Sequence, residues 1–285
     1  MNDLYLACAV VAAIAAGLFL GTRLLIRRMP NMACDLLALA VIVALFYYIA
    51  FVWYDIGLVR WLPVSSLIVL SNWLPLLAAV LAAVVWRRMQ FSPPRQLVYT
   101  GALCLSAGYA LVHPLLGNPP ECGDRWDQLG SCLQTTNITC SPACAATLLS
   151  LHGIEANERE MARLCLTRNG TSWQGLYRGL KLKTAGTPWD VEVRQCSAQE
   201  LRELTGQPMI LSVGLESGST VDGEFSEEFG WVPGVNHSVM LLGFSPQGNA
   251  VIADPTQEQC REHWDRETFE TLWRGYAFRL VERNK

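Results

Sequence analysis

The chain has 285 residues, of which 51% are hydrophobic and 16% are charged, and its formal net charge is −3 at pH 7. Charge is distributed unevenly, because the first 117 residues hold 10 of the 47 Asp, Glu, Lys and Arg residues. This first part has 7 basic and 3 acidic residues, whereas the remainder has 15 basic and 22 acidic ones. An acidic remainder argues against a nucleic-acid partner. The chain also has no Gly-x-x-x-x-Gly-Lys-Ser/Thr loop, so we expect no fused ATPase.

Four long runs without a formal charge dominate the first part of the chain. They cover residues 4–22, 36–54, 61–86 and 96–116. A bilayer core requires about 20 predominantly apolar residues per helix, so these runs predict four transmembrane helices. Helices of a soluble core would show a polar face, which these runs lack. The first run has no basic lead and no small-residue cleavage site, so we expect a retained helix and not a signal peptide.

Polar residues inside these runs are candidates for function, because polar groups are costly in a bilayer. Asn72 and Pro75 interrupt the third run, and His113 lies near the end of the fourth. No second ionisable residue lies deep in a run to form a proton relay. We therefore expect an interhelical hydrogen bond, a kink and an interfacial histidine.

The arginines between the runs predict the orientation, because Lys and Arg are enriched in short cytoplasmic loops. The first and third loops together carry Arg23, Arg27, Arg28, Arg87, Arg88 and Arg95. The second loop carries only Arg60, next to Asp55. We therefore expect loops one and three in the cytoplasm of a bacterial cell. The N-terminus and the C-terminal part would then lie on the extracytoplasmic, periplasmic side of the inner membrane.

The Gly117-Asn-Pro-Pro120 stretch separates the apolar part from the rest of the chain. We predict a four-helix transmembrane region over residues 1–117, a linker over residues 118–129 and one folded domain over residues 130–285.

Cys140 is the candidate nucleophile of this domain. Pro142 suits the first turn of a helix, and the apolar run through Leu151 continues that helix. Cys140 would then lie at the positive end of the helix dipole. A helix N-terminus and a nearby imidazole can lower the pKa of a thiol to roughly 3.5–7.5, which makes it a thiolate nucleophile.

Three further residues complete the candidate site. His237 opens an apolar run that is typical of a buried strand, and Asp254 ends a second short strand over residues 250–253. Adjacent strands could place the Asp254 carboxylate on the far nitrogen of the imidazole and so fix its tautomer. Gln134 lies six residues before Cys140, and its side-chain amide could donate to the oxyanion of a tetrahedral intermediate.

These motifs resemble those of the double-glycine leader peptidases, papain-like cysteine peptidase domains that process bacteriocin and related precursors. The resemblance lies in Gln134 followed by Cys140-Ser-Pro-Ala-Cys144, in His237-Ser-Val-Met-Leu-Leu and in Asp254-Pro255, and it covers about residues 130–281. The chain departs from the family at Thr139, where Asp is usual, and at Ser141, where Gly is usual. Neither departure removes a catalytic group, but both could alter the backbone around the thiol.

The resemblance implies an α+β fold in which an antiparallel sheet faces the helix that starts at Cys140. It also implies a peptidase without a cofactor that cleaves after a small-residue, Gly-Gly-like site through a thioester. Cys140 would attack the carbonyl, His237 would transfer the proton, Asp254 would orient His237, and Gln134 would bind the oxyanion. The expected partners are a peptide or protein precursor, membrane lipid and a separate export or maturation system.

Other interpretations of the cysteines remain open. An extracytoplasmic domain permits disulfides, and seven cysteines follow the apolar part: Cys122, Cys132, Cys140, Cys144, Cys165, Cys196 and Cys260. With Cys140 free, the other six could form three bridges, and Cys122 with Cys132 is the pair we expect first. A zinc site of Cys140, Cys144 and His237 would lack a second close-spaced pair, so we expect no bound metal.

Two other functions use the same residues. A Cys-His-Asp site can transfer its acyl group to an amine, which would make the protein an acyl transferase. An inactive domain could instead bind leader peptides for an export system. The retained thiol favours the peptidase over the binding module.

Overall fold

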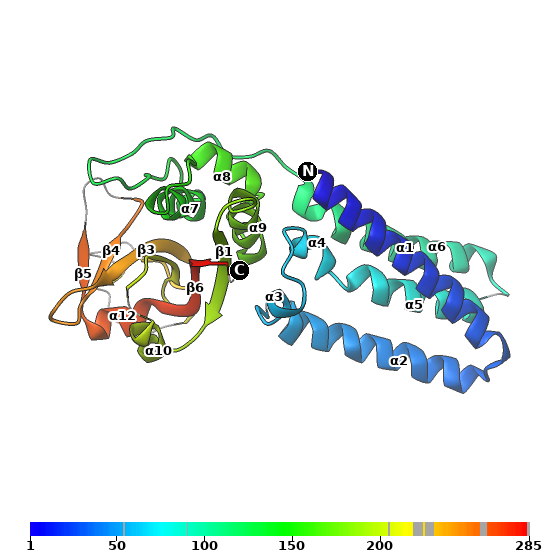
Figure 1. Cartoon of the computed structure of the whole chain (residues 1–285). Coiled ribbons are helices and arrows are strands. Elements are labelled where there is room, and N and C mark those ends of the chain that lie inside the picture. Colours follow the sequence, from blue (N-terminus) through cyan, green and yellow to red (C-terminus); the bar gives the residue numbers. More distant parts are fainter. Residues whose placement is uncertain are drawn as a thin grey trace. The chain divides into compact units, whose positions relative to one another are not determined.

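The computed structural model describes residues 1–53, 55–89, 91–204, 206–218, 225, 231–256 and 261–283. The chain forms two compact units, Met1–Leu116 and Gly117–Lys285. Figure 1 shows that the first unit is helical and that the second combines helices with a sheet.

Long apolar helices build the first unit. Its elements are α1 (Asn2–Leu25), the 3-10 turn η1 (Ile26–Arg28), α2 (Asn31–Tyr47), the π-helical turn η2 (Tyr48–Val52), α3 (Leu58–Trp61), α4 (Leu67–Leu70), α5 (Leu74–Arg88), α6 (Pro93–Val112) and the 3-10 turn η3 (His113–Leu115). Among the described residues, four stretches are long and apolar enough to cross a membrane: Asn2–Arg28, Asn31–Val52, Leu67–Arg88 and Pro93–Leu115. The prediction of four such helices is confirmed.

The third apolar run is broken, as Asn72 and Pro75 indicated. The Asn72 side chain is 2% exposed, and its Nδ2 donates to the Ala110 carbonyl of α6 over 2.8 Å. Its Oδ1 accepts from the Leu74 N–H at the start of α5 (3.2 Å). The Tyr48 hydroxyl donates to the carbonyl of Ser71 (2.6 Å). Side chains thus satisfy backbone groups that the break would otherwise leave without partners in an apolar surrounding.

Ion pairing joins the ends of the helices that carry the arginine-rich loops. The Arg88 guanidinium donates to both carboxylate oxygens of Asp35, over 2.8 and 3.1 Å. The guanidinium of Arg23 lies 5.3 Å from the ring centroid of Trp86. These contacts place the end of α1, the start of α2 and the end of α5 at the same end of the first unit.

An antiparallel sheet forms the centre of the second unit. Among the described residues it has six strands: β1 (Trp189–Gln195), β2 (Met209–Val213), β3 (His237–Phe244), β4 (Ala250–Ala253), β5 (Glu262–Trp264) and β6 (Trp273–Glu282). Their order across the sheet is β1-β6-β2-β3-β4-β5, and each neighbouring pair is antiparallel. The predicted α+β class with an antiparallel sheet is confirmed.

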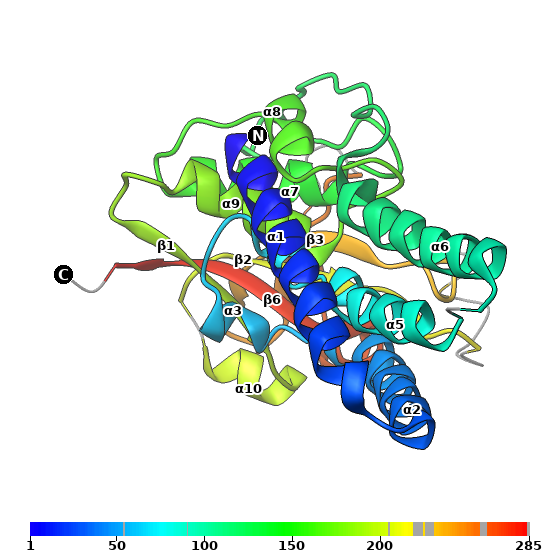
Figure 2. The same ribbon diagram turned by 90° about the vertical axis from the view of Figure 1, so that its right-hand side faces the viewer.

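Helices cover both faces of this sheet, as Figures 1 and 2 show. Helices α7 (Cys140–Leu151), α8 (Glu158–Leu164) and α9 (Trp173–Lys183) cover one face, and α10 (Ala198–Glu203) and α12 (Arg266–Leu272) lie on the other. Helix α7 contacts β2 and β3, the two central strands next to β4 and β6. The predicted helix from Cys140 to Leu151 is confirmed to the residue.

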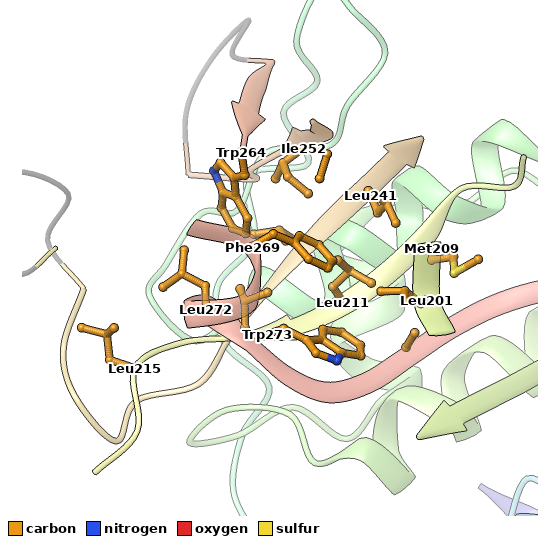
Figure 3. Close-up of a cluster of buried hydrophobic side chains, with 14 residues drawn as sticks. Leu201, Met209, Leu211, Leu215, Leu241, Ile252, Trp264, Phe269, Leu272 and Trp273 are labelled. Carbon is orange, nitrogen blue, oxygen red and sulfur yellow. The ribbon is translucent and has the colours of Figure 1, made fainter. Parts of the chain in front are cut away.

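The core on the α12 side consists of alternate residues of the central strands, because successive side chains of a strand point to opposite faces. Figure 3 shows Phe269 and Trp273 beside Leu211 and Leu241 in this cluster. The rings of Phe269 and Trp273 are stacked with centroids 6.2 Å apart. Strands β3 and β4 contribute Val239, Leu241, Ala250 and Ile252 to this core, so core packing sets where these strands end.

Candidate functional site

Three of the predicted site residues lie at the ends of regular elements of the second unit. Cys140 is the first residue of α7, His237 is the first residue of β3, and Asp254 directly follows β4. Strands β3 and β4 pair antiparallel, and α7 packs on β3. The fold therefore brings Cys140 close to two residues that follow it by 97 and 114 positions in the sequence.

Asp254 contacts the imidazole of His237 directly. The Nε2 atom of His237 lies 3.0 Å from Oδ1 and 3.2 Å from Oδ2 of Asp254. Burial would raise the pKa of the Asp254 carboxyl, but the hydrogen bond and charge of His237 lower it below its ordinary value. Asp254 therefore faces His237 as a carboxylate.

Thr256 fixes the orientation of that carboxylate. Its backbone N–H and its hydroxyl both donate to Oδ1 of Asp254, over 2.8 and 2.6 Å. The sequence analysis did not identify Thr256. The signal was present, because an Asp often accepts a hydrogen bond from the backbone two residues later in a turn.

The pKa values of Cys140 and His237 move in opposite directions. Burial acts to raise the pKa of the Cys140 thiol, but its hydrogen bond to His237 and the positive charge of that imidazole bring it below its ordinary value. Burial acts to lower the pKa of His237, yet the hydrogen bonds to Asp254 and Cys140 and their negative charges raise it to about 10. The pair is thus arranged as a thiolate and an imidazolium.

Two serines join the start of α7 to the start of β3. The hydroxyls of Ser141 and Ser238 are 2.8 Å apart, and both side chains are buried. Each serine directly follows a residue of the candidate site. The thiol of Cys144, one turn along α7, donates to the Ser238 carbonyl over 3.2 Å. Burial raises the pKa of Cys144 well above its ordinary value, which agrees with a structural thiol.

An aromatic ring packs against the imidazole. The ring of Trp231 meets that of His237 edge-on, with centroids 5.8 Å apart, and meets that of Trp264 at 6.2 Å. Trp231 was not predicted as part of the site, because nothing in its local sequence indicates that it folds against His237. The His237 side chain beside this ring is 17% exposed.

Gln134 lies in the loop before α7. Its N–H donates to the carbonyl of Pro255, the residue after Asp254, over 2.9 Å. Its side-chain Oε1 is buried and has no hydrogen-bond partner among the described residues. An amide can exchange its oxygen and nitrogen by rotation, so one end of this side chain is available to a bound group.

The predicted disulfide between Cys122 and Cys132 is wrong, because every cysteine that the structure describes is free. The Cys122 thiol donates to the Pro120 carbonyl over 3.6 Å. Burial raises the pKa of Cys122 to about 11 and that of Cys132 to about 12, so both thiols stay protonated at neutral pH. Sequence spacing does not fix how two sulfur atoms are oriented, which a bridge requires. Cys260 lies outside the described residues.

Alkylation by iodoacetamide is expected to be faster at Cys140 than at Cys196 at pH 7. The lowered pKa keeps Cys140 a thiolate until the pH falls through that pKa, whereas burial raises the pKa of Cys196. The imidazolium partner is lost only as the pH rises through about 10, the pKa of His237. Mass spectrometry of the alkylated peptides across pH measures both rates. The same pH profile at the two cysteines would contradict the charge arrangement.

Comparison with known proteins gives the following similarities. The Peptidase C39-like family matches residues 131–281. The peptidase domain of Streptococcus ComA, a bifunctional ABC transporter of a quorum sensing pathway, is 18% identical with a TM-score of 0.41, over 54% of this chain and 99% of that chain. A double glycine motif protease from an AMS/PCAT transporter, in complex with the leader peptide, is 17% identical with a TM-score of 0.40, over 55% and 97%. Among curated proteins there is no significant match.

Proposed function

Because the chain belongs to the Peptidase C39-like family, we propose that its second unit is an active cysteine peptidase with Cys140, His237 and Asp254 as catalytic residues. The observation that carries the proposal is the position of the His237 imidazole. Its Nε2 is 3.0 Å from the Asp254 carboxylate, and its charge and hydrogen bonding lower the pKa of the Cys140 thiol. A thiolate at a helix start with an oriented imidazole is the arrangement that nucleophilic catalysis requires.

In the proposed reaction the Cys140 sulfur attacks the scissile carbonyl carbon. The carbonyl oxygen becomes an oxyanion, which the Gln134 side-chain amide and the Cys140 N–H bind by hydrogen bonds. His237 then gives its proton to the leaving amine as the C–N bond breaks, and a thioester with Cys140 remains. Water attacks the thioester, His237 takes a proton from that water, and the carboxylic acid product leaves.

The proposed substrate is a peptide or protein precursor with a small-residue, Gly-Gly-like cleavage site. The motifs around Gln134, Cys140, His237 and Asp254 support this class of substrate through their resemblance to double-glycine leader peptidases. A separate export or maturation system is the proposed source of the precursor.

We propose that the four apolar helices anchor the peptidase in a membrane. Their exposed apolar side chains support contact with lipid, because at most 39% of any spanning window is buried within the protein. Six arginines in the first and third loops favour a cytoplasmic position for those loops. The peptidase unit would then lie outside the cytoplasm and act on precursors after their translocation.

A comparison of protein N-termini tests the proposed function. Cells with wild-type protein are expected to contain N-termini that are absent from cells with Cys140→Ala, and these termini identify the substrate. Cys196→Ala serves as the matched cysteine control and is expected to give the wild-type set. Amide adducts in place of new termini would indicate an acyl transferase. Identical termini in wild type and Cys140→Ala would contradict the peptidase and favour a leader-binding domain.

A further inference from the structure

Glu158 is a fully buried carboxylate at the start of α8 that lies outside the catalytic set. Its exposed fraction is 0%, and it is the first residue of the helix, after the Asn157 cap. A buried carboxylate is costly unless it receives hydrogen bonds. The residues that donate hydrogen bonds to the Glu158 carboxylate therefore indicate its role.

The donors of Glu158 belong to the chain before α7. Oε1 accepts from the Thr135 N–H (2.6 Å), and Oε2 accepts from the Thr135 hydroxyl (2.5 Å) and the Asp124 N–H (3.4 Å). The Thr135 oxygen also accepts from the Gly123 N–H over 2.6 Å, so its own proton points to Glu158. All three hydrogen bonds thus require acceptors on Glu158.

Thr135 is the residue next to Gln134, the proposed oxyanion donor. The two peptide groups that flank the Gln134 Cα are therefore each fixed by a hydrogen bond. The Gln134 N–H is held by the Pro255 carbonyl (2.9 Å), and the Thr135 N–H is held by Glu158 (2.6 Å).

We propose that Glu158 is a positioning residue for the oxyanion site, which it serves by holding the backbone of Gln134 and Thr135. The proposal rests on the proposed peptidase function. Glu158 touches neither the nucleophile nor the imidazole, so it acts on the acylation rate through Gln134. Displacing a positioning side chain by about 1 Å can lower the reaction rate by about 100-fold.

Glu158→Gln tests the proposal, because it keeps the shape but places an N–H₂ group against at least one of the three donors. The full-length chain in detergent is mixed rapidly with the p-nitrophenyl ester of acetyl-Gly-Gly, and the initial burst of nitrophenol release gives the acylation rate. We expect Glu158→Gln to slow acylation by roughly 10-fold to 100-fold. In the Gln134→Ala background, Glu158→Gln is expected to lower the acylation rate by less than about twofold. The oxyanion interaction that Glu158 supports is already absent in that background.

Two controls separate positioning from general damage. Glu160→Gln alters the same helix at a residue that pairs with Lys183 over 3.0 Å, and it is expected to acylate like wild type. Alkylation of Cys140 by iodoacetamide is expected to be unchanged in Glu158→Gln, because the thiolate depends on His237. If Glu158→Gln does not fold, Thr135→Val removes one donor and is expected to slow acylation in the same direction.

Several results would overturn the proposal while leaving the peptidase intact. The first is a wild-type acylation rate in folded Glu158→Gln or, if that variant does not fold, in Thr135→Val. The second is an equal loss of acylation rate from Glu158→Gln in the wild-type and Gln134→Ala backgrounds. The third is a loss of Cys140 alkylation that parallels the loss of acylation. If instead wild-type protein and Cys140→Ala both fail to release nitrophenol above background, the proposed function fails first.

Discussion

Replacing His237 with Ala is expected to lower kcat for precursor cleavage by about 10⁶-fold, the loss seen when a triad loses its nucleophile or base. The imidazole has two roles in this site. It keeps Cys140 ionised by hydrogen bonding and by its charge, and it carries the proton to the leaving amine. Without it, burial of Cys140 acts unopposed by these interactions and favours the neutral thiol.

The expected loss is not additive with the loss of the thiol. Cys140→Ala combined with His237→Ala should be no slower than either single variant, because the two groups act as one unit. Single-turnover cleavage of the precursor, followed by mass spectrometry for a Cys140 acyl adduct, measures this. His263→Ala is the histidine control, since His263 is exposed on β5. More than about one tenth of wild-type kcat in His237→Ala would contradict the role of the imidazole.

The parts of this site that the sequence predicts are those set by local chemistry. Pro142 and the apolar residues after it indicate a helix that starts at Cys140, and the helix does start there. The turn chemistry of Asp254-Pro255 closes the strand over residues 250–253, which is β4. A helix start and a strand end depend on a few neighbouring residues, so their positions follow from the sequence alone.

The contacts that join distant residues could not be predicted in the same way. Ser141 and Ser238 are 97 positions apart, and their hydroxyls meet only because α7 packs on β3. Glu158 bonds Thr135 across 23 positions and has no sequence pattern that distinguishes it from a surface acid of α8. The expected Cys122–Cys132 bridge fails for the same reason, since the orientation of each thiol is set by the fold around it.

The third apolar run shows a further limit of hydropathy. The run over residues 61–86 was predicted to span the membrane with an interruption at Asn72 and Pro75, and the spanning stretch is Leu67–Arg88, in which α4 and α5 are separate. Hydropathy measures the apolar character of a run, but it does not show where side chains replace backbone hydrogen bonds. Asn72 and Tyr48 make such replacements at the break.

Asp254→Ala is expected to lower kcat by about 10⁴-fold, the loss seen when the orienting carboxylate of a triad is removed. The imidazole would then lose its 3.0 Å partner and much of the stabilisation of its charged form. Because that partner raises the pKa of His237, the alkaline limb of the pH–rate profile should move below about 10 in this variant. Stopped-flow cleavage across pH measures both effects.

Asp254→Asn is expected to be at least roughly tenfold more active than Asp254→Ala, because it keeps a neutral acceptor where Asp254 has a charged one. Two donors from Thr256 meet at Oδ1, so they hold the amide oxygen of an asparagine at that position. That oxygen would stay near 3.0 Å from Nε2 of His237 and would preserve the tautomer with its proton on Nε2. Thr256→Val in the Asn background removes one of those donors and should abolish the difference. Equal rates for Asp254→Asn and Asp254→Ala would mean that the negative charge of Asp254, and not the orientation it imposes, is what His237 requires.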